Sequence, residues 1–283
     1  MDLLHIEGPD GLRIGLAARG ASWLACRVPM GGGHWRDAVL GFDDAAQWQA
    51  NRAYVGATVG RWANRIAGAQ LQRGGRVWPL ATGPGMRHQL HGGPDGFDRR
   101  AWTLAEHGPD QACFTLHSPA GDQGFPGEVR AQVRYRLLAG LAVQIDVDAE
   151  VRGEASPVCL SHHAYFQLDG RPTDVRRQTL ALAAARVQPV DAEGLPAGGP
   201  VPVAGTALDY LGARPIARAI DHAFVLDAPA AAELVSTDGR LALQVHTTLP
   251  ALQVYTGEFL GNESDLRNST PRLTVDQASC AAL

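Results

Sequence analysis

Hydrophobic and polar positions alternate with a period of two along much of the chain. Between residues 129 and 137 every second residue is apolar, and the positions between them are mostly arginine. After a break at Ala139 and Gly140 the alternation resumes from 141 to 151, now with glutamine, aspartate and glutamate between the apolar residues. A period of two is typical of a strand with one buried face, and a glycine turn joins antiparallel neighbours. We therefore predict two half-buried antiparallel strands whose arginine and carboxylate side chains face one another.

The same alternation recurs at 241–245 and, more weakly, at 102–104 and 113–115. Glycine, proline and aspartate separate these short strands, and residues 43–49 are the best helical candidate. The sequence shows neither an internal repeat nor a linker between domains. We predict an all-β fold, a large antiparallel sandwich or barrel with few short helices, in a single domain spanning residues 1–283.

The composition excludes several classes of function. The 283 residues include 25 basic and 29 acidic side chains, and the formal net charge of −4 argues against a nucleic-acid partner. Every basic residue is arginine, which excludes Schiff-base lysines, pyridoxal-phosphate attachment and a Walker-type phosphate lysine. No apolar run approaches the roughly 18–20 residues of a membrane helix, and the first residues lack the features of a secretory signal. We therefore expect no membrane partner.

The four cysteines are far apart and form no Cys-x-x-Cys pair: Cys26, Cys113, Cys159 and Cys280. Widely spaced cysteines of this kind are typical of thiols in a reducing compartment rather than of a zinc site or a disulfide framework. We therefore expect a cytoplasmic location.

Polar residues cluster in four segments that otherwise have the pattern of strands and turns. These are Gly60–Ile66, His88–Gly93 with its continuation to Trp102, Ser161–Phe166, and Asp221–Phe224 together with Gln253–Gly257. Their arginine, asparagine, aspartate and glutamine side chains form directional hydrogen bonds, and their histidines transfer protons near neutral pH without a cofactor. This residue set favours acid–base chemistry on a neutral polar ligand, although each residue taken alone also fits a structural role.

The histidines do not have the spacing of a metal site. Neighbouring side chains on a strand point to opposite faces, so His162 and His163 would not bind one ion, and His88 and His91 would also diverge. We therefore predict no metal. A metal-dependent sugar isomerase of barrel type that uses His88, His91 and His163 stays open as an alternative.

In their order and spacing, the four segments resemble the aldose 1-epimerase (galactose mutarotase) family. The matching motifs are G-R-x-A-N-R-I, L-H-G-G-x-x-G-F-D-x-x-x-W, H-x-Y-F-x-L, D-H-x-F and Q-V-Y-T-G-x-F-L, and the match runs from about residue 40 to residue 260. The resemblance implies a mutarotase-like antiparallel β-sandwich that interconverts the α and β anomers of free aldoses such as galactose and glucose. It implies an isomerase without a metal or organic cofactor. We expect a small-molecule aldose as partner and a monomer or weak homodimer.

The resemblance also assigns roles to individual residues. His163 matches the family's general acid, and His91 matches a histidine that binds the sugar near the reacting centre. The positions that match substrate-binding residues are Asn64, Arg65, His91, Tyr165, Asp221 and Gln253.

The chain departs from the family pattern after about residue 260. The family's base is a glutamate in an L-E-x-Q segment, which this atypical or shortened C-terminal end lacks. The nearest similar segment, Val275–Gln277, makes Asp276 the expected base, and Glu258 and Glu263 are alternatives in sequence only. Two functions therefore stay open: an active mutarotase, and a catalytically impaired sugar-binding protein on the same scaffold.

Overall fold

The computed structural model describes residues 3–50, 52–171, 173–260, 266–267 and 273–276. The chain divides into two compact units. Unit 1 consists of Leu24–Gly56 and His162–Leu283, and unit 2 of Asp2–Trp23 and Ala57–Ser161. The prediction of a single domain over residues 1–283 stays a prediction.

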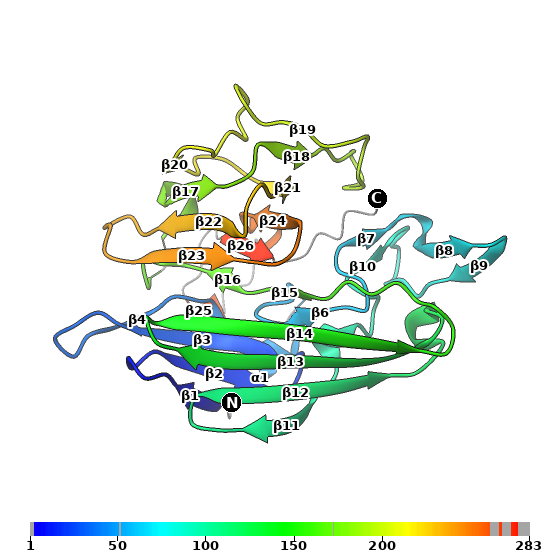
Figure 1. Ribbon diagram of the computed structural model, residues 1–283, viewed down its shortest axis with the longest axis horizontal. Helices are drawn as coiled ribbons and strands as arrows, with labels where there is room; N and C mark the ends of the chain where they lie inside the picture. The colour runs from blue at the N-terminus through cyan, green and yellow to red at the C-terminus, as the bar shows by residue number, and fades with distance from the viewer. Residues whose placement is uncertain (1–2, 51, 172, 261–265, 268–272, 277–283) are drawn as a thin grey trace. The chain divides into compact units, whose positions relative to one another are not determined.

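Strands dominate the described residues (Figure 1), and their long ladders are antiparallel. The α-helix is α1 (Ala45–Ala50). It starts two residues after the predicted helix of residues 43–49 and ends one residue after it. Asp44 starts this helix, because its carboxylate accepts a hydrogen bond from the Ala46 backbone N–H at 2.6 Å. The other helical segments are single 3₁₀ turns. The predicted all-β class with few short helices is therefore confirmed.

The alternating residues 129–151 form two of the four strands of a sheet in unit 2. Its strand order is β11 (Thr103–His107), β12 (Gln111–Ser118), β13 (Glu128–Leu138) and β14 (Ala142–Arg152). The turn between β13 and β14 contains Gly140 with a φ of +79°, as the glycine in the sequence predicts. Both strands thus form where they were predicted.

The predicted charge pairing is confirmed, but the predicted burial of the second strand is wrong. In the register, Arg134 lies opposite Asp146, and the Arg136 guanidinium forms an ion pair with Asp146 at 2.6 Å. The apolar positions of β13 are buried, whereas Val147 and Val151 of β14 are 39% and 38% exposed. β14 is the last strand in the sheet order, so its apolar positions have a neighbouring strand on one side only.

Two antiparallel sheets form most of unit 1. The larger has the order β16 (Tyr165–Phe166), β26 (Leu273–Asp276), β24 (Ala251–Tyr255), β21 (Asp221–Val225), β18 (Arg186–Gln188) and β19 (Val201–Pro202). The other has the order β20 (Arg214–Pro215), β17 (Thr179–Leu182), β22 (Ala230–Val235) and β23 (Ala242–His246). The alternating segment 241–245 therefore forms a strand as predicted. The larger sheet brings together three motif segments that are far apart in the sequence.

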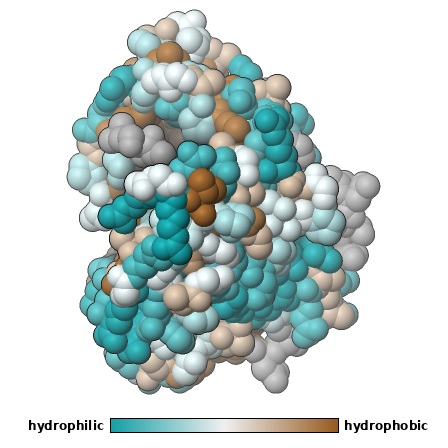
Figure 2. All heavy atoms as spheres, turned by 90° about the vertical axis from the view of Figure 1, so that its right-hand side faces the viewer, coloured by the Kyte–Doolittle hydropathy of each residue, from teal (hydrophilic) through white to brown (hydrophobic). Residues whose placement is uncertain are grey.

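The remaining strands are short and pair mostly as hairpins. They are β1 (Leu4–Glu7) with β2 (Arg13–Ala17), β3 (Ser22–Pro29) with β4 (Trp35–Asp37), β5 (Gly41–Phe42) with β25 (Leu266–Arg267), β7 (Arg65–Ile66) with β10 (Gln89–Leu90), and β8 (Gln70–Arg73) with β9 (Arg76–Pro79), together with β6 (Thr58–Val59) and β15 (Ser161–His162). None of the helices in the described residues has the length and apolar character to cross a membrane. The face in Figure 2 is mostly hydrophilic or neutral, with small groups of hydrophobic residues between.

Candidate active site

In unit 2, two short strands place the first group of predicted sugar-binding residues side by side. β7 pairs with β10, and Arg65 lies opposite Leu90. Asn64 precedes β7 and His91 follows β10, and two hydrogen bonds join them. The His91 backbone N–H donates to the Asn64 carbonyl at 3.1 Å, and the Asn64 backbone N–H donates to His91 Nδ1 at 3.1 Å. The structure thus brings Asn64, Arg65 and His91 together.

These hydrogen bonds orient side chains that can bind hydroxyl groups. Because Nδ1 of His91 accepts a hydrogen bond, the neutral imidazole carries its proton on Nε2, which is then a donor. The Asn64 side-chain oxygen accepts from the Arg65 backbone N–H at 2.8 Å. The φ of Asn64 is +66°, a left-handed conformation that asparagine tolerates better than most residues. The group therefore offers an imidazole N–H, an amide and a guanidinium.

The paired glycines of the L-H-G-G motif permit a close approach of backbones. A Cβ at Gly92 would lie 1.9 Å from the Gly60 carbonyl oxygen, and the φ of Gly92 is +88°. Only glycine fits both the space and the conformation. The same Gly60 carbonyl accepts the Phe97 N–H at 3.0 Å. The first and second motifs of the sequence are thus packed on each other.

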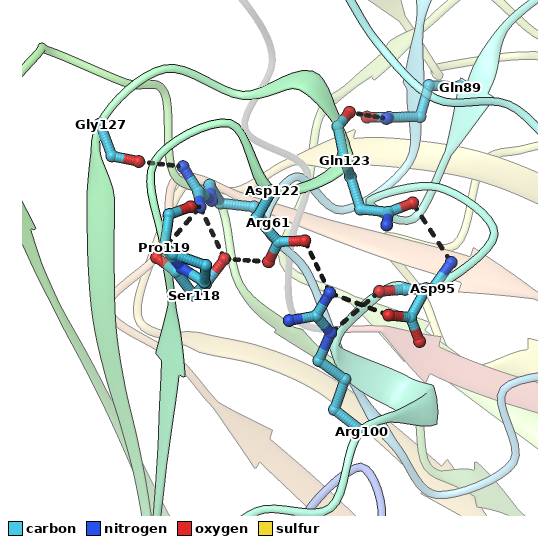
Figure 3. A network of polar contacts seen from close by, with 9 residues as sticks. All are labelled: Arg61, Gln89, Asp95, Arg100, Ser118, Pro119, Asp122, Gln123 and Gly127. Carbon is cyan, nitrogen blue, oxygen red and sulfur yellow. Dashed lines mark hydrogen bonds and ion pairs between the residues drawn. The ribbon is translucent and has the colours of Figure 1, made fainter.

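Arg61 anchors the segment that carries Asn64 and Arg65. Arg61 is 2% exposed, and its guanidinium donates to four backbone carbonyls and two hydroxyls. Figure 3 shows the contacts with Ser118, Pro119 and Gly127. The acceptors are the carbonyls of Ser118, Pro119, Pro126 and Gly127 and the hydroxyls of Ser118 and Ser156, at 2.6–3.3 Å. Burial lowers the pKa of Arg61, and the charge of Asp122 opposes this.

A chain of polar contacts continues from Arg61 toward the second motif. The Ser118 hydroxyl donates to Asp122, whose carboxylate pairs with Arg100 at 2.6 Å. Arg100 also pairs with Asp95 at 2.9 Å, in the loop that follows the paired glycines. This network holds the loops on either side of His91 (Figure 3). The role of Arg61 was not predicted from the sequence, although Arg61 is the first arginine of the G-R-x-A-N-R motif.

In unit 1, the predicted acid His163 lies between β15 and β16 and is 7% exposed. Its imidazole centroid is 5.1 Å from that of Tyr165 and 5.7 Å from that of Tyr54. Burial lowers the pKa of His163 to about 4, and burial together with His163 lowers the pKa of His162 to about 3. The pKa of His163 thus lies below the near-neutral value expected of a histidine acid, because the imidazole is removed from water.

Adjacent strands of the larger sheet join two more predicted residues. Asp221 is the first residue of β21, and Gln253 lies on the neighbouring strand β24. The Gln253 amide donates to the Asp221 carboxylate at 2.7 Å. Tyr255 lies opposite Asp221 in the register, and its ring centroid is 6.3 Å from that of Tyr165. His163, Tyr165, Asp221 and Gln253 thus belong to one unit and are linked through this sheet and its rings.

Asp276, the expected base, is a residue of β26, and the register places its backbone directly opposite Gln253. Its side chain is outside the described part of the structure, as is all of Glu263. Glu258 is exposed, and both of its carboxylate oxygens lie 2.7 Å from the Thr256 hydroxyl. Of the candidate bases, Asp276 is therefore the one whose backbone neighbours a predicted substrate-binding residue.

Two of the three histidines of the metal-dependent alternative accept hydrogen bonds from backbone N–H groups. Nδ1 of His88 accepts the Gly68 N–H at 2.9 Å, just as Nδ1 of His91 accepts that of Asn64. Within the residues that the structure describes, no three histidine, cysteine, aspartate or glutamate side chains form a group that could hold a metal ion. The described cysteines Cys26, Cys113 and Cys159 are buried.

We predict that Arg61→Lys lowers the free energy of unfolding by about 2–4 kcal/mol. An ammonium group cannot reach the acceptors of a planar guanidinium, so buried carbonyls lose their donors. Urea denaturation of both proteins measures the difference. Arg13→Lys is the matched control, because the Arg13 side chain is 48% exposed beside Glu7. Equal stability of the two variants would contradict the anchoring role of Arg61.

We also predict that burial of His163 makes stability depend on pH. The unfolded imidazole has a pKa of about 6.5 and the folded one a pKa of about 4. The unfolded state thus binds more protons between these values, and stability is lost as the pH falls through this window. The contribution of His163 falls by about 2 kcal/mol between pH 7 and pH 5.

Urea denaturation at both pH values measures this loss, which His163→Asn reduces by that amount. His246→Asn, at an exposed position, leaves the loss unchanged. An identical pH dependence in the wild type and His163→Asn would show that His163 is not held neutral by burial.

Comparisons with known proteins give a consistent result. The profile of the family described as aldose 1-epimerase matches residues 2–280. The aldose 1-epimerase of Escherichia coli is 40% identical over 276 residues, which cover 92% of this chain and 79% of that protein. Human galactose mutarotase is 33% identical over 270 residues, which cover 89% of this chain and 76% of that protein.

Solved structures extend the likeness to the fold. An aldose epimerase homologue from C. elegans matches with a TM-score of 0.89 and 26% identity, covering 97% of this chain and 88% of the other. Galactose 1-epimerase from Lactobacillus acidophilus matches with a TM-score of 0.83 and 26% identity, covering 96% and 84%. These matches confirm the predicted mutarotase-like fold and the predicted isomerase class. This chain belongs to the aldose 1-epimerase family.

Proposed function

We propose that this chain interconverts the α and β anomers of a free aldohexose by acid–base ring opening and reclosure. The observation that carries the proposal is His163, a buried imidazole on the segment that leads into the sheet of the Asp221–Gln253 pair. Family membership favours this active enzyme, and no observation favours the impaired sugar-binding protein. Relatives bear the name galactose mutarotase, so galactose and its epimer glucose are the substrates to test.

The chemistry needs one proton removed and one added. A base takes the proton from the anomeric hydroxyl while the His163 imidazolium gives a proton to the ring oxygen. The bond between C1 and the ring oxygen then breaks to give the open aldehyde. Rotation about C1–C2 and closure by the reverse proton transfers yield the other anomer. Each positioned proton-transfer group is typically worth about 10²–10⁴ in rate.

As the acid, His163 must carry a proton that its environment disfavours. Burial lowers the pKa of its imidazole to about 4, so an imidazolium at this position needs a negative charge nearby. We propose that the carboxylate base favours the imidazolium, since a nearby negative charge raises the pKa of a histidine. Asp276 is the proposed base, and its register opposite Gln253 supports this assignment.

The remaining predicted residues bind and orient the sugar. Asp221 and Gln253 offer a carboxylate and an amide that are already hydrogen-bonded to each other. Asn64, Arg65 and His91 offer donors that can stabilise negative charge developing on oxygen. A cytoplasmic location and a monomeric or weakly dimeric state stay predictions.

Polarimetry with fresh α-D-glucose and α-D-galactose tests the proposed function. We expect the wild type to accelerate the approach to anomeric equilibrium and His163→Asn to lower kcat by about 10²–10⁴-fold, because asparagine does not supply the proton. Sugar binding, measured by calorimetry, survives in His163→Asn. His246→Asn, at an exposed position, is the matched control. Equal loss of binding and turnover would instead make His163 a structural residue.

The identity of the base has its own prediction. Asp276→Asn keeps the shape of the side chain but removes the carboxylate, and we expect it to lower kcat by about 10²–10⁴-fold. Glu258→Gln, at the exposed carboxylate beside Thr256, is the matched variant and retains activity. The same polarimetric assay decides between them. If Asp276→Asn turns over like the wild type and Glu258→Gln does not, Glu258 is the base.

A further inference from the structure

Tyr54 lies outside the motifs of the family resemblance, and its backbone conformation is unusual. Its φ is +58°, in the left-handed region that bulky side chains rarely adopt. Its side chain is half-buried, as is that of Ala53, and the chain passes here from the exposed Arg52 to the buried Val55. Non-glycine residues in this conformation persist where the surrounding structure holds them, and they concentrate at functional sites.

Two hydrogen bonds fasten the short segment around Tyr54 to the segment of the predicted acid. On one side of Tyr54, the Tyr165 hydroxyl donates to the Ala53 carbonyl at 3.0 Å. On the other side, the Gly56 backbone N–H donates to the His163 carbonyl at 2.9 Å. All of these residues belong to unit 1. The left-handed turn is thus fixed directly beside His163.

The turn brings the Tyr54 ring against the imidazole. The ring centroids of Tyr54 and His163 are 5.7 Å apart, with an interplanar angle of 40°. The Tyr165 ring also packs against His163, at 5.1 Å and 46°. Both distances are in the range of attractive aromatic contacts. His163 therefore has two tyrosine rings as neighbours, and the strained backbone at Tyr54 places one of them.

We propose that Tyr54 is a positioning residue for mutarotation, because its ring holds the His163 imidazole in the orientation from which it protonates the ring oxygen of the sugar. The inference rests on the proposed function and adds to it a residue outside the resemblance motifs. Proton transfer depends steeply on geometry, and a displacement of about 1 Å can cost on the order of 100-fold in rate. An imidazole that turned freely about its side-chain bonds would lose that geometry.

Three variants separate the ring from the backbone. Tyr54→Phe keeps the ring, and we expect kcat close to that of the wild type. Tyr54→Ala and Tyr54→Gly both remove the ring, and we expect kcat to fall about 10–100-fold in both, with a smaller change in KM. Glycine accepts a positive φ without strain, so Tyr54→Gly melts about 2–4 °C higher than Tyr54→Ala. The melting temperature then differs between Tyr54→Ala and Tyr54→Gly, whereas kcat falls to the same extent in both.

A second measurement does not depend on activity. Diethyl pyrocarbonate modifies accessible imidazoles, and peptide mass mapping reports the rate at each histidine. We expect faster modification of His163 in Tyr54→Ala and Tyr54→Gly, and the wild-type rate in Tyr54→Phe. The exposed His117 and His246 serve as internal controls with unchanged rates.

Recovery of kcat in Tyr54→Gly, but not in Tyr54→Ala, would overturn the proposal, because the backbone and not the ring would then matter. Unchanged modification of His163 in both variants would overturn it as well. A wild type that does not accelerate mutarotation would reject the proposed function, whereas the modification rates would still decide whether Tyr54 holds His163.

Discussion

A guanidinium group that is removed from water needs acceptors for its N–H groups, and the two terminal nitrogens of Arg61 find them on carbonyls and hydroxyls of its own unit. These acceptors come from the loop around Ser118 and Pro119, from Pro126 and Gly127, and from Ser156. Because an unsatisfied buried charge is costly, these loops and the segment of Arg61 constrain each other. Asn64 and Arg65 follow within four residues, so this one buried cation fixes the segment that carries two of the predicted sugar-binding residues.

In unit 1, burial acts on the pKa of His163, the proposed acid. Burial lowers the pKa of the His163 imidazole to about 4, because exclusion of water disfavours its charged form. A buried histidine becomes an acid only in the presence of a compensating negative charge. In the proposed mechanism the carboxylate base therefore has two roles, since it also favours the protonated form of the acid.

At several positions near the proposed site, non-glycine residues have a strained backbone conformation. Tyr54, Asn64 and His91 all have positive φ angles, and each lies at or next to a residue that the proposed mechanism uses. Glycine would relieve the strain at each position but would remove the side chain. The hydrogen bonds between Asn64 and His91, and those on either side of Tyr54, stabilise these conformations. At these three positions, the strained backbone therefore coincides with side chains to which the proposed mechanism gives a role.

The sequence by itself determined the all-β class, the long hairpin of β13 and β14 with its glycine turn, and the residue types of the motifs. A period of two identifies a strand, a glycine identifies its turn, and five short motifs in order identify the family, all through local information. It did not predict that β14 would be exposed, that Arg61 would be buried, or that a tyrosine outside the motifs would pack on His163. Only the tertiary structure decided these features, because burial, the pKa of an imidazole and the partners of a guanidinium depend on segments that are distant along the chain and meet only when it folds.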